Sequence, residues 1–337
     1  MDTDKLNVAV VGVGLFGETH ALAYSHYHRS ELVTVCDVRA DRAREIAEKY
    51  RCGWTTDVEK IAADDRIAAV SIATPDFAHY DVALRMIDAG KHLLIEKPLA
   101  TDVDEAESIV TSAQQAGLTL MVDFHNRWSM PFVKARETVE RGAIGSPVMG
   151  YARLSNTLYV PTQMLSWAAR SGPQWFLLPH TVDLMRWLTG DEAHEVYATA
   201  GRHVLKQRGI DAYDAIQAVV KFENCFATFE TSWINPESSP SVVEFLFFLT
   251  GETGRISIDN TKQGLEIGSE SFVYPRPGPL DIAHGKPGTF MVQPVYHFVD
   301  CVLDNRNPLA TGGDGLAVTK IIAAIERSIE NGTPVSV

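Results

Sequence analysis

The sequence is poor in cysteine, in long apolar runs and in positive charge. Its 337 residues include only 4 cysteines, which stand neither at zinc-ligand spacing nor in the pattern of a secreted disulfide framework. No apolar run approaches the roughly 18 residues that a membrane span needs, and the start of the chain does not follow the pattern of a signal peptide. We therefore expect free thiols, no membrane segment and a cytoplasmic location.

The shortage of positive charge restricts the partners that the protein can have. Lysine and arginine total 30 against 43 aspartates and glutamates, so the formal net charge is −13. Such a surface repels a phosphate backbone and an anionic membrane. We predict a small-molecule ligand and neither a nucleic-acid nor a membrane partner.

The first third of the chain alternates short apolar runs with longer amphipathic ones, in a sequence long enough for about two domains. Near-continuous apolar strands separated by helices are typical of a parallel sheet covered on both faces. The runs predict strands over residues 7–11, 32–36, 67–73, 92–95 and 118–122, and helices over residues 15–29, 40–50, 77–89 and 102–116.

The pattern changes near residues 123–128, and β-rich segments follow from residue 148 onward. We therefore predict a nucleotide-binding domain over residues 1–125 and a second domain over residues 126–337, with the last helices able to pack back on the first domain. In the second domain the sequence predicts a hairpin of strands 214–222 and 225–233, further strands at 242–249 and 255–259, and helices at 131–141, 290–303 and 316–330.

A glycine-rich turn follows the first predicted strand. Residues 12–17 read Gly12-Val13-Gly14-Leu15-Phe16-Gly17, which is G-x-G-x-x-G between a strand and a helix. Gly12 permits the tight turn, Gly14 lets the backbone approach a pyrophosphate, and Gly17 lets the helix lie close to the strand. The helix N-terminus, including the amides of Leu15 and Phe16, then faces the anion.

The residues after the second strand indicate which dinucleotide binds. Asp37 lies 20 residues after Gly17, where a carboxylate accepts hydrogen bonds from the adenosine ribose and repels a 2′-phosphate. This favours NAD over NADP. The arginine after Val38, Arg39, reduces this preference. The alternative for Asp37 is a residue that caps a helix or a turn.

Two further strand ends carry candidate residues, because the carboxyl ends of parallel strands face the ligand crevice. Thr74 and Pro75 follow the third predicted strand and are expected beside the dinucleotide, with His79 either beside it or on a helix surface. Glu96-Lys97-Pro98 follows the strand at 92–95. A desolvated lysine there can accept the proton of a substrate hydroxyl. The alternative for Lys97 is a structural pair with Glu96.

Taken together, these motifs resemble the Gfo/Idh/MocA oxidoreductase family. The glycine turn, Asp37, Thr74-Pro75 and Glu96-Lys97-Pro98 occur in its order and spacing, and the likeness continues through Asn126-Arg127 and more weakly through residues 180–190. The resemblance implies an α/β fold with an N-terminal Rossmann domain and a C-terminal α/β domain with a large, open, predominantly antiparallel mixed sheet. It also implies a homodimer or homotetramer formed through that sheet, and a sugar or polyol substrate.

The resemblance also implies roles for individual residues. Lys97 matches the family lysine that contacts the substrate and the nicotinamide ribose, and His180 matches the second catalytic residue. Pro179 belongs to the first turn of a helix, so His180 is expected near a helix N-terminus, where the dipole favours neutral imidazole. Phe176 stands where the family has an aspartate, and Asp183, one turn after His180, is the nearest carboxylate that can orient it or bind a hydroxyl. The alternative for His180 is a satisfied core histidine.

The remaining substrate candidates are weaker. Asn126 and Arg127 occupy family positions near the nicotinamide or the substrate, although Arg127 is equally consistent with a structural ion pair. Trp167 and Phe176, with Trp175, are consistent with a wall that stacks on a sugar ring or with plain core packing. No residue set predicts a metal site.

These observations predict an NAD-dependent dehydrogenase that oxidises a hydroxyl of a sugar, a sugar derivative or a cyclitol. The missing aspartate leaves two alternatives. A tightly held NAD can oxidise a sugar transiently, so that elimination or hydrolysis follows without net redox change. The chain can also be a dinucleotide-binding regulator with weakened catalysis.

Overall fold

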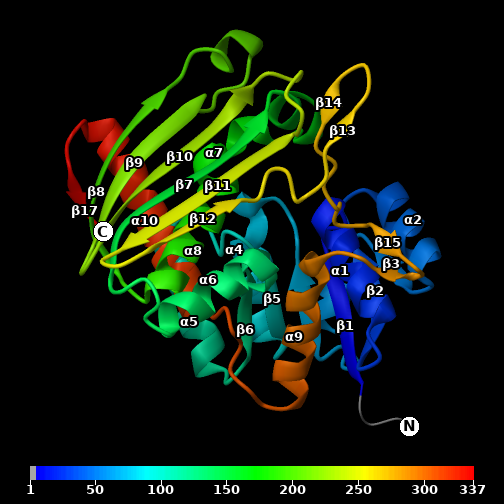
Figure 1. The fold of residues 1–337 in the computed structure, drawn as a ribbon. Coiled ribbons are helices and arrows are strands. Elements are labelled where there is room, and N and C mark those ends of the chain that lie inside the picture. The colour runs from blue at the N-terminus through cyan, green and yellow to red at the C-terminus, as the bar shows by residue number, and fades with distance from the viewer. Residues whose placement is uncertain (1–4) are drawn as a thin grey trace. The chain divides into compact units, whose positions relative to one another are not determined.

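The computed structural model describes residues 5–337, and the chain divides into two compact units. The first unit comprises the residues up to Trp128 together with Pro277–Thr319. The second comprises Ser129–Arg276 together with Lys320–Val337. Each unit is built around its own sheet (Figure 1).

The first unit contains a six-stranded sheet with the order β3-β2-β1-β4-β5-β6, in which every neighbouring pair is parallel. This confirms the predicted Rossmann architecture. The inner strands are buried almost throughout, which explains why they appear in the sequence as continuous apolar runs. The strands are β1 (Leu6–Val11), β2 (Ser30–Cys36), β3 (Gly53–Thr55), β4 (Ala69–Ile72), β5 (His92–Glu96) and β6 (Leu120–Asp123).

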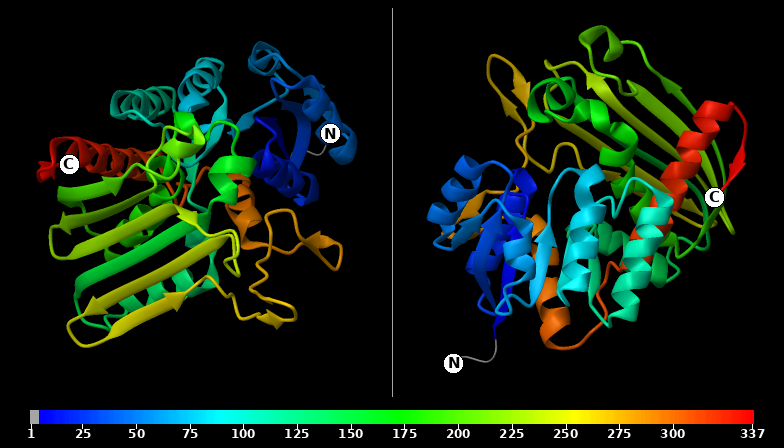
Figure 2. Two further views of the ribbon diagram at one scale, coloured as in Figure 1. Left: turned by 90° about the horizontal axis from the view of Figure 1, so that it is seen from above. Right: turned by 180° about the vertical axis from the view of Figure 1, so that it is seen from behind.

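Helices cover both faces of this sheet (Figure 2). Helix α1 (Leu15–His26) packs against α9 (Gln293–Leu303) on one face, and α4 (His79–Asp88) packs against α5 (Val103–Gln115) on the other. Helix α9 follows a short 3-10 turn at Phe290–Val292, and α1 ends at His26, earlier than predicted. The unit also contains α2 (Ala40–Tyr50), α3 (Val58–Ala62), the 3-10 turns η1 (Asp76–Ala78) and η2 (His125–Trp128), and the small ladder of β15 (Ile282–Ala283) and β16 (Lys286–Pro287).

The second unit contains a seven-stranded mixed sheet with the order β12-β11-β7-β10-β9-β8-β17. Its pairs are antiparallel except for β7 with β10, as the family resemblance implied. The predicted hairpin is confirmed as β9 and β10. The strands are β7 (Pro147–Thr157), β8 (Ala193–Gly201), β9 (Ala215–Phe222), β10 (Phe226–Asn235), β11 (Val243–Gly251), β12 (Arg255–Asp259) and β17 (Val335–Ser336).

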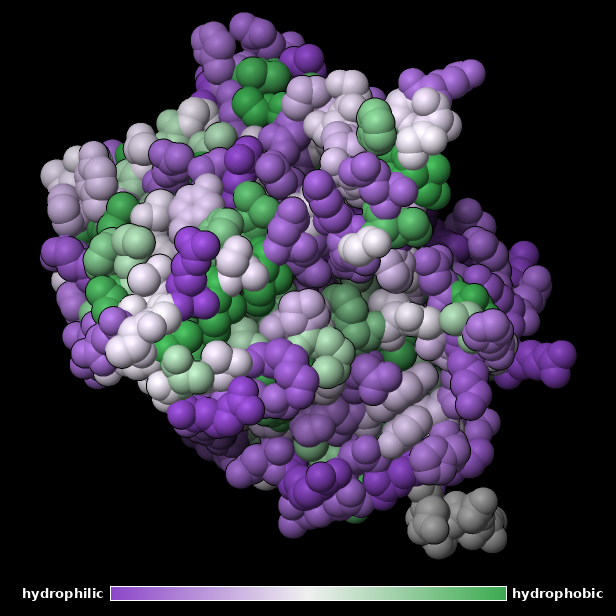
Figure 3. Space-filling model, viewed as in Figure 1, coloured by the Kyte–Doolittle hydropathy of each residue, from purple (hydrophilic) through white to green (hydrophobic). Residues whose placement is uncertain are grey.

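Helices of the second unit pack on one face of this sheet. Side chains alternate between buried and exposed along β9, which is typical of a sheet with one face on the core and one in solvent. In Figure 3 apolar side chains gather over the sheet on the left of the view. The helices are α6 (Met130–Glu140), α7 (Pro173–Phe176), α8 (Leu178–Thr189) and the later turns of α10 (Gly312–Asn331), and a small ladder pairs β13 (Ile267–Gly268) with β14 (Phe272–Val273).

Candidate functional site

The glycine turn between β1 and α1 is shaped by two close backbone approaches. Gly12 has a φ of +82°, and a Cβ there would lie 2.6 Å from the amide nitrogen of Thr74. A Cβ on Gly17 would lie 1.8 Å from the carbonyl oxygen of Gly12. At Gly14, by contrast, a Cβ would have no heavy atom within 4 Å. The turn is therefore tightly packed on its protein side and open at Gly14, as a pyrophosphate cradle requires.

Asp37 is held against this turn by two backbone amides. Its Oδ2 accepts a hydrogen bond from the amide of Val13 at 3.0 Å, and its Oδ1 accepts one from the amide of Arg39 at 2.9 Å. The Arg39 Nε lies 3.8 Å from Oδ1, and Val38 is exposed. Since each carboxylate oxygen has a further lone pair, Asp37 retains the capacity to accept two ribose hydroxyls.

The loop after β4 is tied to the loop after β5 by His79. Its Nδ1 lies 2.8 Å from the carbonyl oxygen of Pro98, and its Nε2 lies 3.1 Å from that of Thr74. His79 is 1% exposed, so its interpretation as a helix-surface residue is wrong. The Thr74 hydroxyl is buried and has no hydrogen-bond partner, which leaves it available to a ligand beside Pro75. Whether His79, Thr74 and Pro75 contact the cofactor stays a prediction.

Glu96 and Lys97 are both buried at the carboxyl end of β5. Burial lowers the pKa of the Lys97 ammonium, and the nearby carboxylates of Glu96, Asp76 and Asp123 oppose this effect. The Glu96 carboxylate accepts the backbone N–H of Lys97 at 3.2 Å. A lysine with a lowered pKa, on the same sheet edge as the glycine turn, is suited to exchange a proton with a bound hydroxyl.

The sequence analysis missed two residues of this region, His20 and Asp123. The His20 Nε2 lies 3.1 Å from Asp123 Oδ2 and 3.3 Å from Glu96 Oε1, and all three side chains are buried. The only signal in the sequence is that His20 follows Gly17 by three residues and that Asp123 ends an apolar strand. Neither is specific enough to predict the contact.

Asn126 and Arg127 lie on η2 and are buried. Arg127 Nη1 donates to the carbonyl oxygen of Leu309 at 2.5 Å, and its Nη2 lies 3.2 Å from Asp314 Oδ1. The structure therefore shows the ion pair that the sequence analysis left open for Arg127. Nearby, Phe16 stacks on His125 with a ring-centroid distance of 6.0 Å, and Leu15 is exposed at the start of α1.

In the second unit, His180 and Asp183 lie on α8. Pro179 occupies the first turn of this helix, so the predicted place of His180 near a helix N-terminus is confirmed. Both side chains are buried, at 8% and 1% exposure. Their spacing of three residues puts them on the same side of α8.

Phe176 is part of an aromatic cluster in the second unit. Its ring centroid lies 6.1 Å from that of Trp167 and 5.8 Å from that of Trp233. Trp175 points elsewhere, since its Nε1 donates to Glu326 at 3.1 Å. Trp233 is fully buried on β10, and its indole N–H has no hydrogen-bond partner. No motif in the sequence singles out Trp233, so this unsatisfied donor beside Phe176 is visible only in the structure.

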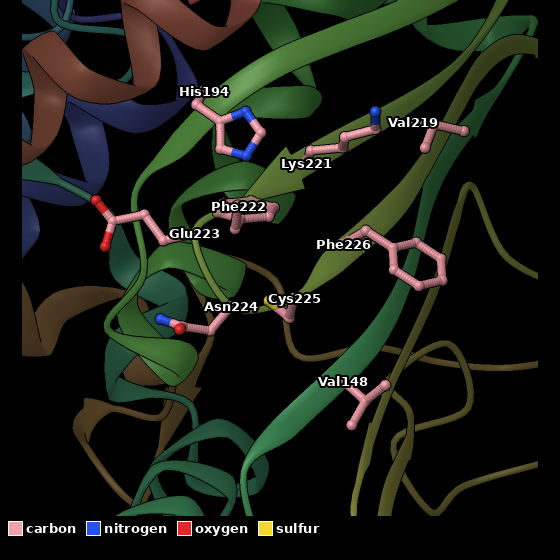
Figure 4. Close-up of a pocket in the computed structure, with 9 residues that line it drawn as sticks. All are labelled: Val148, His194, Val219, Lys221, Phe222, Glu223, Asn224, Cys225 and Phe226. Atoms are coloured by element: carbon pink, nitrogen blue, oxygen red, sulfur yellow. The ribbon is translucent and has the colours of Figure 1, made fainter.

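An open pocket lies at the turn between β9 and β10 (Figure 4). Its lining residues belong to β7, β8 and this hairpin, and none of them is a predicted site residue. The pocket is therefore separate from the candidate catalytic residues. In the described residues 5–337, no helix is both long enough and apolar enough to cross a bilayer.

Comparisons with known proteins support the same identification over both units. Residues 6–124 match the profile described as "Oxidoreductase family, NAD-binding Rossmann fold", and residues 132–257 match "GFO/IDH/MocA C-terminal domain". The chain is 25% identical to the uncharacterized oxidoreductase YrbE of Bacillus subtilis, over 99% of this chain and 97% of that protein.

Other relatives carry more specific names. An inositol 2-dehydrogenase of Rubrobacter xylanophilus is 31% identical over 63% of this chain and 60% of that protein. The fold is also that of scyllo-inositol dehydrogenase from Lactobacillus casei, solved with NAD(H) and scyllo-inositol. That likeness has a TM-score of 0.86 and 20% identity, over 98% of this chain and 99% of that one.

Proposed function

The chain belongs to the GFO/IDH/MocA oxidoreductase family and is an NAD-binding oxidoreductase, and from this premise we propose that it oxidises a hydroxyl of a sugar, a sugar derivative or a cyclitol. The observation that carries the proposal is the buried lysine at the end of β5, on the same sheet edge as the glycine turn. Relatives named inositol 2-dehydrogenase and D-glucoside 3-dehydrogenase support this substrate class.

The first unit fits the dinucleotide. The open space at Gly14, the positive φ of Gly12 and the position of Asp37 suit the pyrophosphate and the adenosine ribose. When bound, NAD supplies the hydride acceptor at C4 of its nicotinamide. We assign cofactor contacts to this set: Gly12, Gly14, Leu15, Phe16, Gly17, Asp37, Val38, Arg39, Thr74, Pro75, His79, Glu96 and Lys97.

The chain's own contribution to the chemistry is proton transfer and orientation. Lys97 accepts a hydrogen bond from the substrate hydroxyl and takes its proton as the hydride leaves carbon. His180 is the second proposed catalytic residue, with Asp183 as the carboxylate that orients it or binds a hydroxyl. Asn126, Arg127, Trp167 and Phe176 are the other proposed substrate contacts. Because Phe176 cannot accept a hydrogen bond, the unsatisfied N–H of Trp233 is the polar group that we assign to hydroxyl recognition there.

The direct test is to incubate the protein with NAD and a panel of inositols, glucosides and anhydrosugars. Turnover is measured by the absorbance of the reduced cofactor. Steady accumulation of NADH with at least one member supports the dehydrogenase. Product formation without accumulating NADH replaces it with transient oxidation followed by elimination or hydrolysis. Tight NAD binding with no product from any member contradicts both catalytic assignments.

Cofactor choice provides a prediction for Asp37. Replacement by serine removes the charged acceptor of the ribose hydroxyls and the repulsion of a 2′-phosphate. We expect kcat/KM with NAD to fall about 10- to 100-fold, which corresponds to one lost charged hydrogen bond of about 1.5–3 kcal/mol, while activity with NADP rises. Asp41→Ser, an exposed aspartate in the first turn of α2, is the matched control and leaves the NAD-to-NADP ratio unchanged. An unchanged ratio in the Asp37→Ser variant contradicts the assignment.

A second prediction concerns Trp233. The Trp233→Phe variant keeps an aromatic ring against Phe176 and loses only the N–H donor and one ring. We expect KM for the substrate to rise about tenfold, the loss of roughly 1.4 kcal/mol, with NAD affinity unchanged. The matched variant Trp175→Phe loses instead the N–H that donates to Glu326. We expect its thermal stability to fall and its KM to stay at the wild-type value. Equal KM in Trp233→Phe and wild type refutes substrate contact by Trp233.

We further propose a homodimer or homotetramer through the open face of the seven-stranded sheet. Large apolar side chains on this face, including Met149, Tyr197, Val219 and Phe226, are each at least 40% exposed, and such patches mark protein interfaces. We expect the double substitution Val219→Lys and Phe226→Lys to reduce the mass in solution to that of one chain, measured by light scattering. Met130→Lys, an equally apolar exposed site on α6, leaves the mass unchanged.

The cytoplasm remains the location that we propose for the enzyme. The four cysteines Cys36, Cys52, Cys225 and Cys301 are all free thiols, and three of them are buried. Free thiols without disulfides are typical of proteins in reducing compartments.

A further inference from the structure

The first unit holds a buried cluster of three ionisable groups next to Lys97. His20 comes from α1, Glu96 from the end of β5 and Asp123 from the end of β6, and each is at most 6% exposed. The imidazole Nε2 of His20 lies 3.1 Å from Asp123 Oδ2 and 3.3 Å from Glu96 Oε1. A single imidazole therefore joins the glycine-turn helix to the ends of β5 and β6, and Lys97 directly follows the end of β5.

The cluster is charged at neutral pH. Burial opposes the charged form of His20, but hydrogen bonds to Asp123 and Glu96 outweigh it and raise the pKa of His20 to about 9. Burial and the neighbouring Glu96 carboxylate raise the pKa of Asp123 to about 6, whereas His20 keeps the pKa of Glu96 below its usual value despite burial. Between about pH 6 and pH 9 the cluster thus consists of one imidazolium and two carboxylates, with one net negative charge.

This charge acts on Lys97. Three carboxylates attract its ammonium, those of Glu96, Asp76 and Asp123, and two of the three are the ones held by His20. The imidazolium cancels part of the negative charge of these carboxylates. It therefore reduces the amount by which they raise the pKa of Lys97. The effect of His20 on Lys97 therefore passes through the two carboxylates.

We propose that His20 and Asp123 are positioning residues which, through Glu96, set the charge that faces Lys97 and hence the pH range in which this lysine can accept a proton. This inference rests on the proposed function, in which Lys97 takes the proton of the substrate hydroxyl. It goes beyond that function because it assigns a role to a histidine and an aspartate that the proposed proton transfer does not itself use.

Other titratable groups face the cluster from the elements packed around it. Tyr24 of α1 stays protonated, since burial raises its pKa and its hydroxyl lies 2.7 Å from that of Ser71. Burial lowers the pKa of His79 of α4. Asp76 of η1 acts on Lys97, and His125 of η2 acts on Glu96. None of these is changed by the variants below, so differences between them report the cluster.

The test uses His20→Gln, Asp123→Asn and the double variant. Loss of the imidazolium leaves the carboxylates uncompensated, so in His20→Gln the acidic limb of kcat/KM moves to higher pH by about one unit. Loss of one carboxylate moves it to lower pH in Asp123→Asn by a smaller amount, because the imidazolium of His20 also loses its hydrogen bond to Asp123. The double variant removes one charge of each sign, and its midpoint returns close to that of wild type. If the residues are purely structural, the variants lose rate or stability but all pH midpoints stay equal. Equal midpoints therefore overturn the proposal.

A second readout does not depend on turnover. An amine reacts with acetic anhydride only when it is neutral, so competitive labelling of the whole protein across pH, read by peptide mass spectrometry, reports the titration of Lys97 directly. The same opposite shifts are expected there. If no polyol is oxidised but labelling shows these shifts, the proposed function fails while the charge-setting role stands. If His20→Gln does not fold, the shift of the Lys97 titration to lower pH in Asp123→Asn tests the proposal without it. Stoichiometric divalent metal in the purified protein overturns the proposal, because a cation would then join the carboxylates.

Discussion

We expect the Lys97→Ala variant to lose about 10²- to 10⁴-fold in kcat/KM for the best polyol substrate, the range for removal of a positioned proton acceptor. The side chain is buried at the carboxyl end of β5, and burial lowers its pKa. We therefore expect the substitution to slow the proton-transfer step. The glycine turn and Asp37 are unaffected, so the dissociation constant of NAD changes far less than the rate. Steady-state kinetics and calorimetric titration with NAD measure the two quantities.

Two further variants separate proton transfer from a structural pair with Glu96. Lys97→Arg keeps a positive charge beside Glu96 but cannot give up its proton, because the arginine pKa exceeds 12. If Lys97 serves only as an ion-pair partner, arginine restores activity; if it accepts a proton, the variant is as slow as Lys97→Ala. Lys91→Ala is the matched control, since Lys91 is also buried, precedes the opposite end of β5 and donates to the carbonyl oxygen of Asp64. It leaves turnover near that of wild type.

The Rossmann unit could be predicted from the sequence because its information is local. Strands such as β4 and β5 are buried on both faces, so they appear as apolar runs, and the glycine turn has a fixed position between a strand and a helix. The edge strand β3 was missed because it has only three residues and two of them are exposed. An inner strand of the second unit, β7, ends in small polar residues and shows no clear alternation there.

The site was predictable only where a motif marks it. Asp37 and Lys97 stand at fixed distances from strand ends, whereas His20 and Asp123 meet across 103 residues and have no local pattern. The same holds for Trp233, whose importance lies in an unsatisfied N–H that only packing against Phe176 reveals. Residues whose role comes from long-range contacts therefore need the fold before they can be recognised.

The other large expected effect concerns two glycines at the start of α1, Gly17 and Gly14. Alanine at the first position is expected to reduce stability, and alanine at the second to reduce NAD affinity. In Gly17→Ala the new methyl group would lie 1.8 Å from the Gly12 carbonyl oxygen, a backbone atom that cannot move without displacing the turn. We expect the free energy of unfolding to fall by about 3 kcal/mol, the upper end of the usual cost of overpacking. Urea unfolding of the protein without cofactor measures this loss.

Gly14→Ala should leave the free protein unchanged, since its Cβ would have no heavy atom within 4 Å and the backbone φ of −64° is ordinary for alanine. The methyl group would instead occupy the space through which the pyrophosphate approaches the backbone. We expect wild-type unfolding in urea and an NAD dissociation constant raised about tenfold or more, a cost of at least about 1.4 kcal/mol. Wild-type NAD affinity in Gly14→Ala would mean that the dinucleotide does not approach the turn at Gly14, since the fold is intact in this variant and only the space beside the turn is altered.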